Sequence, residues 1–156
     1  MAKNTTVTTE NNCDVDQSLQ VLSDLYKNVT MAQNAVKTLL PYVEDTELTK
    51  QLHKQVEAYD EYTEKIGTVA KNLNFDPTPA PQFAITMAGM GIRFKMATDR
   101  TNTHIAKIML QGTLNGLIDL YRLTNKLDEV HPEIALLTRQ VLKYEEGQFE
   151  WMKGQL

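Results

Sequence analysis

The stretch from Leu48 to Leu73, LTKQLHKQVEAYDEYTEKIGTVAKNL, decides the fold class of this 156-residue chain. Its candidate inward-facing residues recur at steps of four and three over the whole segment. They are Leu48, Leu52, Gln55, Tyr59, Tyr62, Ile66, Val69 and Leu73. A half-buried strand would alternate apolar and polar residues instead, so the spacing predicts one long amphipathic helix with a continuous inner stripe.

A similar pattern precedes this segment along the chain. Asp14 or Asp16 can act as its N-cap, and Pro41 ends it. Its predicted inner stripe is Val15, Leu19, Leu22, Tyr26, Val29, Gln33, Val36 and Leu40. The second helix opens at residues 45–47, DTE, whose acidic side chains suit the positive end of a helix dipole. Because the connection is short, we expect an antiparallel hairpin.

The stretch NFDPTPAPQ, residues 74–82, ends the second helix, because its three prolines fix extended backbone and lack amide donors. Beyond this linker, residues 83–96 predict a shorter apolar helix that is loosened by Gly89 and Gly91. Polar residues follow it. The pattern leaves open whether residues 83–103 form one kinked helix or two.

Two further long helices are predicted after residue 103. The first has one apolar row at Ile105, Met109, Gly112, Gly116, Leu120, Leu123 and Leu127, and a second at Leu110, Leu114, Leu117 and Tyr121. The two glycines of the first row would let a neighbouring helix approach closely. The last helix starts at Pro132, which suits a first helical position. Its stripe is Ile134, Leu137, Val141, Tyr144, Gln148 and Trp151.

These segments together predict an all-α protein, an up-and-down four-helix bundle with an extra short helix between helices two and three. A stripe spacing that averages 3.5 residues favours shallow, left-handed helix crossing. Residues 1–14 are rich in Thr and Asn and poor in apolar groups, so we expect a disordered tail there. Residues 15–156 form the bundle domain in this interpretation.

Composition argues against several classes of partner. The 16 basic and 20 acidic residues are spread along the chain without a basic run, so we expect no binding to nucleic acid. No apolar run approaches the roughly 18 residues of a membrane span, and the first residues lack the apolar core of a signal peptide. We therefore expect a cytoplasmic protein that does not bind membranes. Cys13 is the only cysteine, which excludes an internal disulfide.

The chain resembles the ferritin-like superfamily, in which two helix hairpins are joined by a longer connection after the second helix. It is most similar to a small bacterial branch in which DxEL opens the second helix and a glycine-containing short helix precedes the third. The matching pieces are DTEL at 45–48, NFDP at 74–77, and the segment with Gly89 and Gly91. The similarity covers residues 17–154 and implies a ferritin-like bundle.

The resemblance also implies where a metal site would lie. Ferritin-like di-metal proteins use a Glu from each of two helices and an inward Glu-x-x-His from each of the others. Here the polar residues of the inner stripes are Gln33, Gln55 and Gln148, and Glu145 lies on the flank of the last stripe. None of the three histidines follows a Glu by three residues, and neutral amides cannot balance two divalent ions. We therefore expect an interior polar cluster of these four residues, with no metal, cofactor or catalytic residue.

Three functions fit this description. The leading prediction is a structural or interaction protein, not an enzyme, that forms a homodimer. The alternative is a ferritin-like metal-binding protein or oxidoreductase with a non-standard carboxylate set, whose side chains would converge in one interior pocket. Its candidate ligands are Glu57, Asp60, Glu61, Asp119 and Glu145. A third possibility is a small organic ligand enclosed by the interior, which would require a cavity of several hundred Å³.

The tyrosines and methionines of the chain also have predicted positions in the fold. Five tyrosines are predicted to give an aromatic inner surface whose hydroxyls the glutamines could pair: Tyr26, Tyr59, Tyr62, Tyr121 and Tyr144. Met87, Met90 and Met96 are predicted to cap one end of the core, since methionine fills irregular gaps. The sharper interpretation is an adaptable apolar patch that docks a partner subunit.

Overall fold

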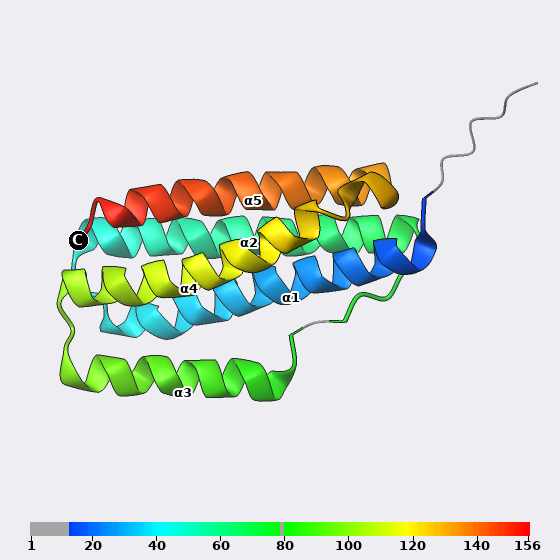
Figure 1. The fold of residues 1–156 in the computed structure, drawn as a ribbon. Coiled ribbons are helices and arrows are strands. Elements are labelled where there is room, and N and C mark those ends of the chain that lie inside the picture. Colours follow the sequence, from blue (N-terminus) through cyan, green and yellow to red (C-terminus); the bar gives the residue numbers. More distant parts are fainter. Residues whose placement is uncertain (1–12, 79) are drawn as a thin grey trace, which may run out of the picture.

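The computed structural model describes residues 13–78 and 80–156, and this part of the chain is helical with no strand (Figure 1). Five α-helices and two 3-10 turns follow one another within it. They are α1 Val15–Leu39, η1 Leu40–Tyr42, α2 Thr46–Asn72, α3 Gln82–Thr98, α4 Asn102–Thr124, η2 Leu127–Glu129 and α5 Pro132–Lys153. Apart from Cys13 and Asp14, the predicted tail of residues 1–14 lies outside the described residues.

Four of the α-helices pack along one another, and α3 lies outside them (Figure 1). The α1–α2 and α4–α5 pairs are antiparallel hairpins, and they pack together through α1 against α4 and α2 against α5. The chain returns along the outside of α1 as α3, so that α2 and α4 run in the same direction. This arrangement places α1, α3 and α4 side by side around one side of the molecule.

Side-chain caps explain where three of the helices begin. The carboxylate of Asp14 accepts a hydrogen bond from the Gln17 amide at α1, and that of Asp45 accepts one from the Leu48 amide at α2. Thr101 caps α4 in the same way. At the end of α2, Asn74 adopts a φ of 55°, a left-handed conformation that asparagine tolerates. Local chemistry therefore sets these boundaries.

The stripe predicted for α2 is confirmed. Leu48, Leu52, Gln55, Tyr59 and Ile66 are buried, and the other three members of the stripe are half-buried. The interior of α2 therefore contains a glutamine and a tyrosine as well as apolar residues. These two polar side chains are the ones that reach the candidate site described below.

The stripe predicted for α1 is confirmed at Leu22, Val29, Gln33 and Val36, which are buried, and Leu40 is half-buried. Val15 is 61% exposed, and Leu19 and Tyr26 are half-buried. The residues that replace them inside are Ser18, Val21, Leu25 and Leu39. A straight α-helix has 3.6 residues per turn, so a stripe drawn at strict 3.5 spacing drifts around the helix by about 20° per heptad. The buried face of α1 is also wider than one row, since Val21 and Leu25 beside the stripe are buried as well.

The region left open by the sequence forms one helix and then breaks. α3 runs without interruption through Gly89 and Gly91, and extended backbone at Asp99 separates it from α4. Met96 is fully buried, as predicted for a core methionine. Met87 and Met90 are exposed, so the prediction that they cap the core is wrong, because α3 buries only the face that rests on α1.

None of the helices in the described ranges combines the length and the apolar character needed to cross a lipid bilayer. α3, the most apolar of them, has 17 residues.

Candidate functional site

A pocket of about 930 Å³ lies between α1, α3 and α4, and it reaches inward to α2 and α5. Small residues on the facing helices make room for it: Ala32 and Ala35 on α1, and Gly112 and Gly116 on α4. A methyl group added at Gly112 would have no neighbour within 4 Å. The prediction that these glycines let a helix approach closely is therefore wrong at Gly112, which faces open space instead.

The two long walls of the pocket remain connected next to this open space. Asn28 on α1 donates from Nδ2 to the backbone oxygen of Gly116 on α4, at 3.0 Å. A Cβ at Gly116 would lie at an ordinary distance of 3.5 Å from the same amide group. The Asn28 hydrogen bond therefore connects α1 and α4 at Gly116, and Gly112, one helical turn earlier on α4, leaves open space.

Most of the surface of the pocket is apolar, its floor is polar, and charged side chains also line its walls: Asp24, Lys27, Lys95, Asp119, Arg122 and Lys126. The apolar wall residues are Met31, Val36, Leu39, Ile92, Ile108, Met109 and Leu123. The floor consists of Gln55 and Tyr59 from α2 and Glu145 from α5, all of which are buried. A mostly apolar cavity with a few convergent polar groups is the usual composition of a small-molecule site.

Glu145 is the unusual residue of the floor. Its side chain is 3% exposed, and its Oε1 atom is buried without a hydrogen-bond partner. Burial raises the pKa of this carboxyl from its ordinary value of 4.5 to about 7, although a hydrogen bond from the Tyr59 hydroxyl acts in the opposite direction. A carboxyl group that is close to half-ionised at neutral pH therefore faces the pocket.

Three tyrosines surround Glu145. Tyr144 contacts Tyr59 edge-on with 5.9 Å between ring centroids, and it contacts Tyr62 with 5.6 Å. Burial, reinforced by the charge of Glu145, raises the pKa of all three hydroxyls. They therefore stay protonated and can donate hydrogen bonds over the whole physiological range.

Not all of the predicted tyrosines share this interior. Tyr26 is half-buried, and Tyr121 is 48% exposed and donates to the Glu146 carboxylate outside the core. The interior tyrosines also do not use the glutamines as partners. Tyr59 interacts with Glu145, and the Tyr62 hydroxyl donates to the backbone oxygen of Gln140 at 3.5 Å.

The glutamines separate into two groups. Gln55 is 2% exposed and donates from Nε2 to Oε1 of Gln148 at 2.7 Å, and Gln51 donates to the same oxygen at 2.9 Å. Gln33 is also buried, but it donates to the Asp60 carboxylate. The structure thus brings Gln55 and Gln148 together and connects them to Glu145 through the pocket floor, whereas Gln33 belongs to a different contact between α1 and α2.

The carboxylates considered as metal ligands do not converge. Glu57, Asp60, Glu61 and Asp119 are exposed, and Glu145 is the one buried member of the set. Among residues 13–78 and 80–156, no three His, Cys, Asp or Glu side chains gather in a position to hold a metal ion. The donor atoms at the floor are one carboxylate, amides and phenols, which suit hydrogen bonding to an organic molecule.

Sequence reasoning named Gln55 and Glu145 and raised an interior ligand cavity as its third possibility, but it did not place that cavity between α1, α3 and α4. A signal was present in the small residues at 32 and 35 on the first helix and at 112 and 116 on the fourth, since two facing rows of small side chains leave space between helices. Comparison of the chain with protein-family models, curated proteins and solved structures finds no match in any of the three.

Proposed function

We propose that this chain is a ligand-binding helical bundle that takes a small organic molecule into the pocket between α1, α3 and α4. The observation that carries this proposal is the buried Oε1 of Glu145, which lacks a partner at the floor of a pocket of about 930 Å³. Protein interiors are close-packed, and a buried polar atom left unpaired costs about 1–3 kcal/mol. A bound molecule that fills the space and supplies a donor would remove both costs.

The same proposal places the bundle in the ferritin-like superfamily. Its support is the order of the helices: two antiparallel hairpins joined by one long connection, so that α2 and α4 run parallel. In place of the di-metal ligands, the interior of this chain contains Gln55, Gln148 and a single carboxylate, Glu145. We infer a bundle whose interior site binds an organic ligand instead of two metal ions.

The carboxylate-metal alternative has less support. It requires several of its five acidic side chains in one interior pocket, and four of them are exposed. Glu145 alone cannot hold a pair of divalent ions, which in ferritin-like sites are bridged and balanced by several carboxylates. The geometry therefore favours the organic ligand.

The binding test uses a neutral apolar dye and a variant that fills the pocket. N-phenyl-1-naphthylamine, titrated into the full chain, should bind at one site per chain with a rise in fluorescence. Gly112→Leu should weaken this binding at least tenfold, because its side chain enters space in which a Cβ has no neighbour within 4 Å. Gly67→Leu is the matched control, since Gly67 on α2 also has no neighbour within 4 Å but lies away from the pocket.

Two outcomes would contradict the proposed function. One is the absence of saturable dye binding to the wild-type chain. The other is equal binding by the Gly112→Leu and Gly67→Leu variants, which would place the dye elsewhere on the surface. Circular dichroism spectra of both variants check that the helices are intact.

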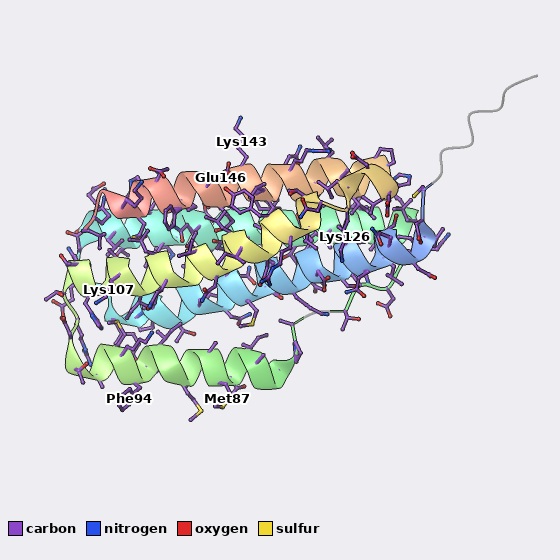
Figure 2. The ribbon with its side chains drawn as sticks, viewed as in Figure 1. Met87, Phe94, Lys107, Lys126, Lys143 and Glu146 are labelled. Atoms are coloured by element: carbon purple, nitrogen blue, oxygen red, sulfur yellow. The ribbon has the colours of Figure 1, made fainter. Side chains whose placement is uncertain are left out.

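A second candidate function, an interaction role, is favoured by the outer face of α3. Met87, Met90 and Phe94 lie there at helical spacing with 51%, 55% and 77% of their surfaces exposed. Figure 2 shows Met87 and Phe94 pointing away from the other helices. We infer that this apolar row pairs with the same row of a second copy, because a two-fold dimer brings identical patches together.

A further inference from the structure

The described part of the chain provides no cation for the carboxylate of Glu145. Five ion pairs form within residues 13–78 and 80–156, and none of them includes Glu145. Four cations line the pocket, and none of them pairs with Glu145: Lys27 pairs with Asp24 and Arg122 with Asp119 along their own helices, while Lys95 and Lys126 form none of these five ion pairs. The charge at the floor is therefore left for a ligand to balance.

The remaining acceptors at the floor point to the same chemistry. Gln55 uses one N–H of its Nε2 group on Gln148, which leaves its carbonyl oxygen as an acceptor and its second N–H as a donor. Glu145 presents an oxygen without a partner. The pocket floor therefore offers two acceptors, Gln55 and Glu145, together with the aromatic ring of Tyr59. These groups stabilise a positively charged group that has several N–H donors.

We propose that the ligand of this pocket is a primary or secondary ammonium compound with an apolar body, whose N–H groups donate to Glu145. This assignment rests on the ligand-binding function proposed above and specifies its chemical class. An ammonium group satisfies both the charge and the unpaired oxygen of the carboxylate, whereas a neutral alcohol satisfies only the oxygen. A carboxylate ligand would be repelled by Glu145.

The apolar walls define the rest of the ligand. Methionine and branched aliphatic side chains from α1, α3 and α4 enclose the space between the floor and the surface. Such walls bind an aliphatic or aromatic body by removing its surface from water. The ligand class is therefore amphiphilic, with the charged end inward and the apolar body between the helices.

Binding of an ammonium compound should depend on pH through Glu145. The ligand binds the ionised carboxylate, so below the pKa of about 7 it must displace a proton, and its affinity should rise with pH up to about 7 and then level off. No histidine is among the residues that line the pocket. Other ionisable residues line the pocket or interact with Glu145. They are Asp24 and Lys27 on α1, Tyr59 and Tyr62 on α2, Lys95 on α3, Asp119 and Arg122 on α4, Lys126 after it, and Tyr144 on α5. Glu61 on α2 acts in turn on Tyr62 and Tyr144.

The test compares three probes of similar shape by isothermal titration calorimetry on the full chain: 2-phenylethylammonium, 2-phenylethanol and 3-phenylpropionate. At pH 8 the ammonium compound should bind at least tenfold more tightly than the other two. Its affinity should fall by at least fivefold between pH 8 and pH 6. In the Glu145→Gln variant, the preference for the ammonium compound over the alcohol and the dependence on pH should both disappear.

The outcomes separate this assignment from the function on which it rests. If the naphthylamine dye binds and Gly112→Leu blocks it, but the ammonium probe binds no better than the alcohol, the pocket is a ligand site of another class and the assignment is wrong. A preference for the ammonium compound that survives in Glu145→Gln also overturns it. If neither dye nor probes bind the wild-type chain, both proposals fail.

Discussion

At the scale of single residues, Glu145 links the stability of the fold to its proposed function. A carboxyl group that is 3% exposed and lacks a partner for Oε1 is costly to ionise, which is why burial raises its pKa to about 7. A neutral side chain at this position would avoid that cost. The residue is therefore explained better by a ligand that it contacts than by the packing of the helices.

The cost of ionising Glu145 predicts a specific dependence of stability on pH. Between its ordinary pKa of 4.5 and about 7, the folded chain retains a proton that the unfolded chain has lost, so the free energy of unfolding falls as pH rises through this window. Glu145→Gln cannot ionise and should be more stable than wild type by up to about 3 kcal/mol at pH 8, with most of the difference absent at pH 4.5. Urea unfolding at pH 4.5, 6 and 8 measures it.

Glu150→Gln is the matched control for this experiment. Glu150 lies on the same helix, is exposed and forms its ion pair with Lys153 at the surface, so its removal should leave the pH dependence of wild type unchanged. Parallel pH profiles of wild type and Glu145→Gln would show that the Glu145 carboxyl ionises in the folded chain as it does in the unfolded one.

At the scale of elements, α4 gives up helix stability to keep space between helices. Gly112 and Gly116 lie within its 23 residues, and each costs roughly 1 kcal/mol relative to alanine in a helix interior. α1 faces them with Ala32 and Ala35, which combine small size with high helix propensity. The pocket thus depends on two facing helix surfaces, and its two glycines reduce the helix stability of α4 more than the two alanines reduce that of α1.

Gly112→Ala should therefore stabilise the protein. The added methyl group meets no atom within 4 Å and the helix gains propensity, so the free energy of unfolding should rise by about 0.5–1 kcal/mol. Gly154→Ala should give no such gain, because its Cβ would lie 3.2 Å from the backbone oxygen of Trp151 at the end of α5. Urea unfolding of both variants at pH 7 tests the pair. A loss of stability in Gly112→Ala would mean that the pocket wall is closed at this position.

At the scale of the whole molecule, α3 is the element that the rest of the fold covers least. It packs chiefly against α1, and its outer face carries the exposed row of Met87, Met90 and Phe94 (Figure 2). Methionine adapts to varied surfaces, and an exposed aromatic residue is a frequent anchor in protein interfaces. The helix that forms one wall of the pocket is thus also the helix through which two copies would meet.

The proposed pairing of two chains through α3 predicts how single substitutions change the assembly. Sedimentation equilibrium of the wild-type chain should give twice the mass of one chain, and Phe94→Glu should give the mass of one, because it places a charge at the most exposed residue of the apolar row. Leu136→Glu is the control: Leu136 is 58% exposed on α5, away from α3, and its substitution should leave the dimer intact. A wild-type chain that sediments as a monomer, or a dimer that persists in Phe94→Glu, would contradict this arrangement.

The order and boundaries of the helices follow from local sequence. Asp45 caps α2 with its own side chain, and the prolines of residues 74–82 and Pro132 act through the backbone of their immediate neighbours. The stripe of α2 could be read from spacing alone, because it is continuous over the whole helix. Such features depend on residues within a few positions of one another, which the sequence contains in full.

The candidate site depends on which helix faces are neighbours, and local sequence does not specify that. On α1, Val21 and Leu25 are buried beside the predicted stripe, and on α5 Glu145, predicted on the flank of its stripe, is buried. From the sequence, Gly112 is predicted to contact a neighbouring helix, but the structure shows open space beside it. The sequence therefore determined the helices and their order. The tertiary structure alone decided that a carboxylate on α5 lies at the floor of a space between α1, α3 and α4. That space exists only where helix surfaces that are distant in the chain meet.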